Sequence, residues 1–162
     1  MDTQPPYENP NITNFLKANH IAVLATADKT SAAPHAATIF YATDSKMNIF
    51  FVTKENTAKN RNLTGNPQAA IAIYDGAKQE TAQIFGPVSK VDDPAMMGKA
   101  LRIMTKYSVA TSGSEEIPIS KIDAGQYVLY KLSPQSIRLA EYKYGPKNDI
   151  FDVAVPPGES LE

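Results

Sequence analysis

The stretch FVTKENTAKNRNLTGNP, residues 51–67, places three basic side chains around the expected start of a helix: Lys54, Lys59 and Arg61. A helix N-terminus already carries partial positive charge from its unpaired N–H groups, so cations there lower the stability of the helix unless an anion binds. Together with the hydroxyl of Thr57, these donors suit a phosphate group. The alternative interpretation, a solvated helix whose lysines keep the protein soluble, stays open on spacing alone.

Apolar runs and turn residues predict the elements that position this turn. We expect short helices over residues 11–19, from Thr57 to about Thr64, and from the Asp93-Pro94 cap onward. The segment 108–120 has the composition of a loop. We expect strands over residues 20–27, 35–43, 47–53, 68–75, 81–91, 126–133 and 136–143.

The close spacing of the strands predicts a mainly β protein, a small antiparallel barrel with short helices. Long crossover helices, which a parallel sheet would need, are not evident between the strands. Gly86-Pro87, inside the fifth run, predicts a bulge or bend of the kind that barrel corners need. The 162 residues fit one domain, with its core over about residues 12–142 and an irregular tail over 144–162.

Composition excludes several classes of function. The 16 basic and 17 acidic residues nearly balance, which argues against a partner that is nucleic acid or a membrane surface. The chain has no cysteine, so disulfides, thiolate metal sites and cysteine catalysis are excluded. Two histidines are too few for a strong metal site, so we predict none. Neither a signal peptide nor a membrane-spanning run is evident, and we expect a cytoplasmic protein.

The order of these elements resembles the pyridoxamine 5′-phosphate oxidase-like family of FMN-binding split β-barrels. The resemblance covers about residues 12–142 and extends over many weakly diagnostic positions. The segments that carry it are VLATAD (23–28), PHAATIFY (34–41), IFFVTKENTAKNRNLTGNP (49–67), AAIAIYD (69–75) and IFGPVSKVDD (84–93). It implies a six-stranded antiparallel split barrel that forms a homodimer, with FMN at the subunit interface.

The resemblance also implies roles for individual residues. Lys54 is expected by the flavin ring or ribityl chain, where it would stabilise reduced anionic flavin, and Gln83 is a candidate hydrogen-bond partner of the flavin pyrimidine. An outward-facing strand position is the equally weighted alternative for Gln83. The other expected cofactor contacts are Ala37 and Thr38 beside the cofactor, Thr53 by the ring or ribityl chain, Thr57 and Lys59 at the phosphate, and Asn62 in support of the turn.

The chain departs from true pyridoxamine phosphate oxidases at two phosphate-binding positions. Those enzymes have an arginine where this chain has Ala37, and Arg-Lys where it has Ala58-Lys59. Each lost charged hydrogen bond is worth roughly 1.5–3 kcal/mol, although Arg61 is a candidate substitute. The C-terminal arginine and histidine pattern that binds substrate in those enzymes is not evident either. We therefore do not predict vitamin B6 oxidation.

These features predict an FMN-dependent oxidoreductase that takes electrons from a small molecule such as a reduced nicotinamide. The flavin carries out the chemistry, and no side chain is assigned as catalytic. Three alternatives stay open. They are a flavin-binding stress or sensor protein without turnover, the same barrel binding deazaflavin F420 or haem, and a dimer with no cofactor.

Overall fold

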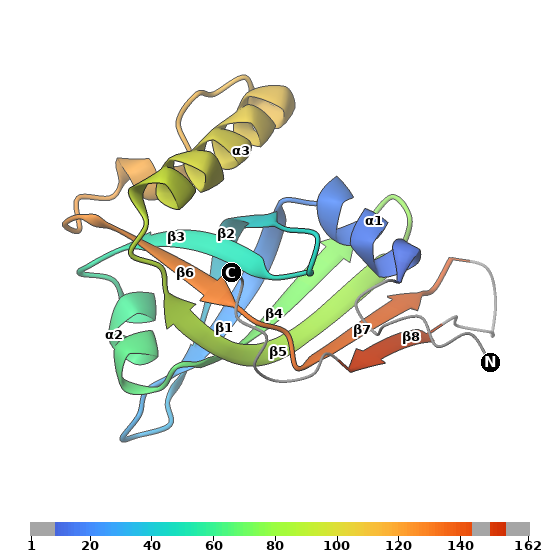
Figure 1. Ribbon diagram of the computed structural model, residues 1–162, viewed down its shortest axis with the longest axis horizontal. Helices are drawn as coiled ribbons and strands as arrows, with labels where there is room; N and C mark the ends of the chain where they lie inside the picture. The colour runs from blue at the N-terminus through green and yellow to red at the C-terminus, as the bar shows by residue number, and fades with distance from the viewer. Residues whose placement is uncertain (1–8, 144–149, 155–162) are drawn as a thin grey trace.

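The computed structural model describes residues 9–143 and 150–154, which form a barrel with helices on its outside (Figure 1). The three α-helices are α1 (Pro10–Ala18), α2 (Ala58–Gly65) and α3 (Pro94–Ser112), and one 3₁₀ helix, η1, spans Pro118–Lys121. The strands are β1 (Ile21–Ala27), β2 (Pro34–Thr43), β3 (Ile49–Lys54), β4 (Gln68–Asp75), β5 (Glu80–Lys90), β6 (Tyr127–Leu132), β7 (Ser136–Glu141) and β8 (Ile150–Ala154).

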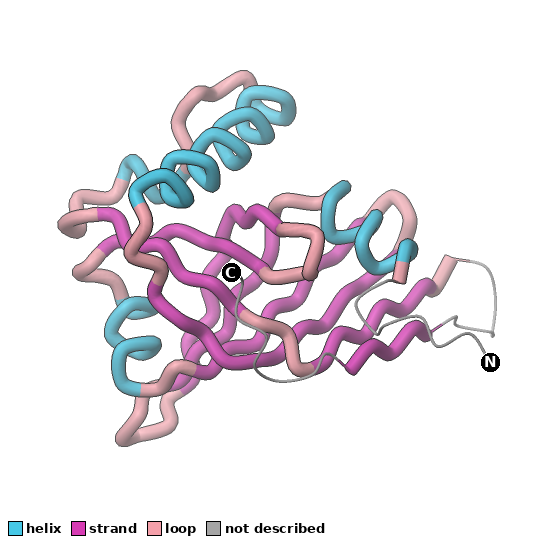
Figure 2. The backbone as a smooth tube through the Cα atoms, in the orientation of Figure 1, coloured by secondary structure: helices cyan, strands magenta, loops and turns pink. Residues whose placement is uncertain are grey.

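Six of the strands close into an antiparallel barrel in the order β4-β1-β2-β3-β6-β5, and the pairing of β4 with β5 completes the ring (Figure 2). The remaining strands, β7 and β8, extend the sheet from β5. This arrangement confirms the split barrel that the sequence predicted. Each of the six strands therefore has a partner on both sides over part of its length, which is how a closed barrel limits unpaired strand edges.

A change of partner along β5 produces the split. Residues 80–85 of β5 pair with β7, whereas residues 88–90 pair with β6. Gly86 lies between the two regions, where the connection from β6 to β7 crosses so closely that a Cβ atom would lie 2.2 Å from the carbonyl oxygen of Ser133. The predicted bend at Gly86-Pro87 is therefore confirmed, and glycine is required there because of this close backbone approach.

Strand alternation fills the barrel with apolar side chains. On β1, Leu24 is buried, whereas Val23 next to it points outward and is exposed. The helix α1 covers part of this core with three buried side chains, Ile12, Phe15 and Leu16. The hydroxyl of Tyr41 donates a hydrogen bond of 2.9 Å to the carbonyl oxygen of Leu16, and burial raises the pKa of Tyr41, so the hydroxyl stays a neutral donor.

A second apolar cluster lies outside the barrel, under α3. Side chains from the outer face of β3 and from β6 pack there against Ala100 and Met104 of α3 and against Ile117, which precedes η1. This cluster packs α3 against one side of the barrel, and η1 follows directly after its member Ile117 (Figure 1). In the part of the chain that the structure describes, none of the helices combines the length and apolar character that a membrane crossing needs.

Two expectations about irregular segments are wrong in part. The expected loop over 108–120 begins with the last turn of α3, which ends at Ser112, and it contains η1. The hydroxyls of Thr111 and Ser112 donate to helix carbonyls one turn back, which reconciles their polar composition with a helix. In the expected irregular tail, β8 pairs with β7, and the rest of the tail lies outside the described residues.

Candidate functional site

The turn between β3 and α2 is organised by the hydroxyl of Thr57, the N-cap residue of α2. This hydroxyl donates to the carbonyl oxygen of Lys54 at 2.9 Å and accepts from the backbone N–H of Asn60 at 3.3 Å. Its oxygen also lies 2.8 Å from the hydroxyl oxygen of Thr53. Because the single hydroxyl proton of Thr57 is already used, Thr53 must be the donor in that contact. Thr57 therefore holds the turn in shape, and both lone pairs of its oxygen are occupied.

The first two backbone N–H groups of α2 remain available. Among the described residues, none accepts a hydrogen bond from the N–H of Ala58 or of Lys59. N–H groups at the start of a helix are the donors that anions bind. The capped turn thus presents two parallel donors together with the positive end of the helix dipole.

The side chain of Lys59 adds a full charge next to these donors. Lys59 is half-buried, and burial lowers the pKa of its ammonium group. Neither of the two ion pairs found among the described residues, Lys90–Asp92 and Lys121–Glu116, involves it. A half-buried cation without an acidic partner is costly in free energy, and an anionic ligand would remove that cost.

Polar contacts, rather than apolar packing, hold α2 against the barrel. Leu63 is its single buried side chain. The side-chain amide of Asn62 donates to the hydroxyl of Thr26 on β1 at 3.0 Å, and the hydroxyl of Tyr130 on β6 donates to the side-chain oxygen of Asn60 at 2.6 Å. Asn62 thus ties α2 to β1, and its predicted role in support of a cofactor-binding turn stays a prediction.

A small hollow opens beside Lys59, with a volume of about 120 Å³. Thr38 of β2 and Val52 of β3 form part of its lining. On its other side are residues of α3 and of the segment around η1, and the complete lining is Thr38, Ile39, Phe40, Val52, Lys59, Met104, Ile117, Pro118, Ile119 and Ile122. The structure therefore brings Thr38, Lys59 and the α2 turn together.

Three of the predicted contact residues are not part of the lining of this hollow. The side chain of Ala37 is on the inward face of β2, in register with the buried Leu24, whereas that of Thr38 is on the outward face. Thr53 is completely buried beneath the turn. The ammonium group of Lys54 donates to the backbone carbonyl of Ile122 and lies 5.1 Å from the centre of the Tyr127 ring. These positions leave the predicted cofactor contacts of Ala37, Thr53 and Lys54 as untested predictions.

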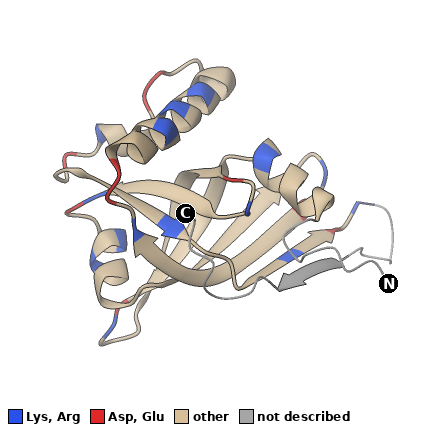
Figure 3. Cartoon of the chain, viewed as in Figure 1, with Lys and Arg blue, Asp and Glu red and all other residues tan. Residues whose placement is uncertain are grey.

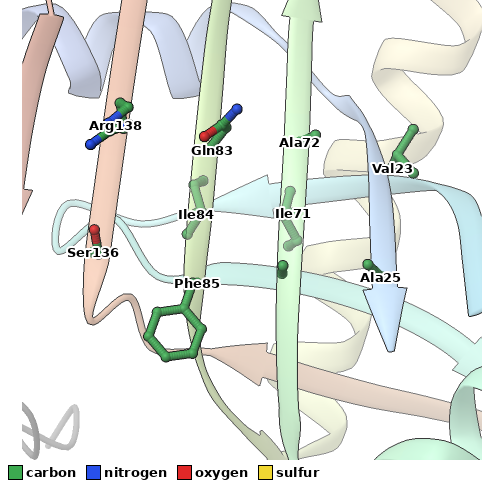
Figure 4. A pocket seen from close by; sticks show the side chains of 10 residues that line it. Val23, Ala25, Ile71, Ala72, Gln83, Ile84, Phe85, Ser136 and Arg138 are labelled. Carbon is green, nitrogen blue, oxygen red and sulfur yellow. The ribbon is translucent and has the colours of Figure 1, made fainter. Parts of the chain in front are cut away.

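Gln83 lies on a different surface, the outward face of β1, β4, β5 and β7. It is in register with Arg138 of β7, and the two side chains lie next to each other in a hollow of about 430 Å³ (Figure 4). Three strand intervals separate Gln83 from Thr38 along one row of the sheet, Thr38–Val23–Ala72–Gln83. At about 4.8 Å per interval, Gln83 lies roughly 14 Å from Thr38 within one subunit.

Sequence reasoning did not find the residues that close the hollow. Ile117, Ile119 and Ile122 belong to a segment that reads as a loop, and their contacts with β2 and β3 span more than sixty positions of the chain. The periodicity of a short sequence segment cannot predict contacts between residues that lie this far apart in the chain. Phe40 and Val52 lie in predicted strands, but the sequence analysis assigned neither of them to the site.

Comparison with known proteins assigns the family. The sequence model of the pyridoxamine 5′-phosphate oxidase family matches residues 9–140 of the chain. The chain belongs to the pyridoxamine 5′-phosphate oxidase-like family. The matched residues include the α2 turn and every position for which the sequence predicted a cofactor contact. No curated protein matches the chain by sequence.

Solved structures of similar fold bind different groups. One is a pyridoxamine 5′-phosphate oxidase-related, FMN-binding protein from Nostoc punctiforme (16% identity, TM-score 0.60, covering 96% of this chain and 99% of that one). A FAD-binding protein from Mesorhizobium loti has 14% identity and a TM-score of 0.61 over 81% of this chain and 90% of its own. A haem-binding protein from Mycobacterium smegmatis has 16% identity and a TM-score of 0.65 over 95% of this chain and 60% of its own. At these identities the comparisons show the split-barrel fold that the family members share.

Proposed function

We propose that this family member is an FMN-dependent oxidoreductase that binds the FMN phosphate at the turn between β3 and α2. The observation that carries the proposal is the half-buried ammonium group of Lys59, which has no acidic partner among the described residues and adjoins two N–H groups without acceptors. This set of donors suits a dianion attached to a larger molecule. The Nostoc punctiforme neighbour, an FMN-binding protein, supports the choice of flavin.

The residues of this chain then have defined tasks. The N–H groups of Ala58 and Lys59 and the ammonium group of Lys59 bind the phosphate, and Thr57 keeps the turn in its binding shape. Thr38 and Val52 border the adjoining part of the ligand. Bound FMN supplies hydride and electron transfer at its ring system, with a reduced nicotinamide as the proposed electron donor. No side chain is required as a general acid or base.

We further propose a homodimer that uses the outward face of β2, β1, β4 and β5. The strands β1 and β2 contain no Lys, Arg, Asp or Glu, and the charged residues of β4 and β5 stand at the strand ends (Figure 3). Ile21, Val23 and Phe85 are large apolar residues exposed on this face. One row across the four strands reads Ala36, Ala25, Ala70 and Phe85. An uncharged sheet face of this width is unusual on a surface that meets only water. Because Thr38 belongs both to this face and to the hollow at Lys59, a cofactor there would lie at the interface.

The phosphate assignment is tested by replacing Lys59 with alanine. We expect Lys59→Ala to weaken FMN binding about tenfold or more, because a charge-assisted contact in a half-buried site is lost. Titration of the purified protein with FMN, followed by quenching of flavin fluorescence, measures the change. Lys99→Ala, which removes an exposed lysine from α3, is the matched control and should leave the affinity unchanged. An equal affinity in the two variants would remove Lys59 from the site.

The affinity for FMN should also fall at alkaline pH. Burial lowers the pKa of Lys59 below its ordinary value of 10.5, so the free protein loses this positive charge at a lower pH than an exposed lysine would. The affinity for FMN is therefore highest while Lys59 is protonated, and it falls as the pH rises through the lowered pKa of Lys59. Lys59→Arg should keep its affinity over the same range, because a guanidinium stays protonated. Ionisation of the flavin itself affects both proteins equally, so a parallel decline in both would contradict a role for Lys59.

The absorption spectrum and anaerobic reduction test the chemistry separately. We expect the protein with added FMN to show a flavin spectrum that bleaches with a reduced nicotinamide. A stable flavin complex that never bleaches would favour the binding protein without turnover, and a haem or deazaflavin spectrum in the protein as purified would identify another ligand.

A further inference from the structure

The wall of the hollow at Lys59 is formed largely by one segment, residues 113–125, which we call the strap. It includes η1 and supplies Ile117, Pro118, Ile119 and Ile122 to the lining. With the strap in this position the hollow measures about 120 Å³, whereas pockets for ligands of drug-like size measure roughly 300–1,000 Å³. A phosphate and its first carbon atoms would fit beside Lys59, but a three-ring flavin system would not.

A glycine with a left-handed backbone conformation stands at each end of the strap. Gly113 and Gly125 have φ angles of 72° and 89°, a left-handed conformation that favours glycine. Between them, only Ile117 and Ala124 are buried, and Ile122 leaves 47% of its surface exposed although it lines the hollow. A short segment with few buried side chains between two glycines is the kind of element that opens at a small cost in free energy.

The strap is fastened to the turn that presents the anion donors. The ammonium group of Lys54 donates to the carbonyl oxygen of Ile122 and lies over the ring of Tyr127. At the end of the strap, the N–H of Asn56 donates to the carbonyl oxygen of Ala124 at 2.8 Å. Figure 1 shows the strap, in orange between α3 and β6, at the same end of the barrel as α2.

We propose that the strap is a lid over the binding site, that a planar ring system enters when the strap moves away, and that Lys54 is the latch that holds it closed. The inference rests on the proposed function for the identity of the ligand. It assigns Lys54 as a positioning residue that acts on the strap, and not as a contact of the cofactor. Removing the latch should therefore raise the population of the open state, which is the state that binds.

Lys54→Met tests this directly, because it keeps the aliphatic chain and removes both the charge and the hydrogen bond. We expect FMN to bind the variant faster and about threefold or more tighter, since less of the protein is held in the closed state. If Lys54 were instead a ligand of an anionic cofactor, the same variant would bind FMN more weakly. Stopped-flow quenching and equilibrium titration give the two quantities. Lys106→Met, which removes an exposed lysine from α3, is the matched control and should resemble the wild type.

Hydrogen exchange of the ligand-free protein provides a readout that does not depend on FMN. Peptides that cover residues 113–126 should exchange about fivefold or more faster in Lys54→Met, whereas peptides from β1 should not change. Unchanged exchange of the strap, or weaker binding of FMN by the variant, would overturn the proposal. Faster exchange with an unchanged association rate would show that the strap does not control entry, which also overturns it. If wild-type protein does not bind FMN at all, the proposed function fails, and the exchange experiment alone decides whether Lys54 is a latch.

Discussion

Replacing Gly86 with alanine is expected to lower the free energy of unfolding by about 3 kcal/mol or more, or to prevent folding. The added Cβ would lie 2.2 Å from the carbonyl oxygen of Ser133 and 3.1 Å from the backbone nitrogen of Gln135. Both are backbone atoms in the connection that crosses β5, so no side chain can rotate away to make room. The backbone N–H of Gln135 donates to the carbonyl oxygen of Phe85 next to Gly86, so a shift would also disturb this hydrogen bond.

Urea unfolding at one fixed protein concentration measures the loss, with Gly98→Ala as the matched control. In α3 the new Cβ would meet only the end of the flexible Arg102 side chain, at 3.4 Å. Alanine is a better helix former than glycine by about 1 kcal/mol, so this variant should be more stable than the wild type. Similar unfolding midpoints for the two variants would contradict the crossing that we describe at Gly86.

Replacing Ala70 with aspartate should raise the dissociation constant of the proposed dimer about a hundredfold or more. Ala70 lies on the outward face of β4, in register with Ala25 on one side and Phe85 on the other. A carboxylate there would be taken out of water into an interface whose nearest strand neighbours, Ala25 and Phe85, are apolar, and burying a charge costs several kcal/mol. Sedimentation velocity should show a dimer for the wild type and a monomer for Ala70→Asp at the same micromolar concentration.

Ala95→Asp is the matched control for this experiment. Ala95 is exposed in the first turn of α3, where a carboxylate is compatible with the helix dipole. This variant should remain a dimer, which separates the effect of position from the effect of charge. A monomeric wild type would refute the dimer, and a dimeric Ala70→Asp would place the interface on another face.

The barrel could be predicted because its determinants are local. Alternating or continuous apolar runs separated by turn residues mark each barrel strand, and Gly86-Pro87 marks the bend in β5. The end of α3 was missed because serine and threonine favour loops unless their hydroxyls find helix carbonyls, as those of Thr111 and Ser112 do. The strand β8 was missed because its run, IFDVA, is only five residues long and its pairing with β7 is a contact formed in the fold.

Only the part of the candidate site that lies within the turn between β3 and α2 could be predicted from the sequence. Thr57 and Lys59 are two residues apart, and their relation to the start of α2 follows from the sequence. The partner of Lys54 is a backbone carbonyl 68 residues away, and backbone groups leave no signature in a sequence. Gln83 lies on the outward face of β5, which was one of the two interpretations of its position in the sequence. Its distance from Thr38, however, depends on the order of the strands in the sheet.

The manner in which α2 is attached has a consequence for thermodynamics. Side-chain hydrogen bonds tie this helix to β1 through Asn62 and to β6 through Asn60, while Leu63 alone buries apolar surface. Hydrogen bonds fix direction as well as distance, so the two free N–H groups are aimed before any ligand arrives. Association at the turn therefore requires little ordering of the backbone. Calorimetry with inorganic phosphate should accordingly show a heat-capacity change near zero, the sign of preorganised polar recognition without burial of apolar surface.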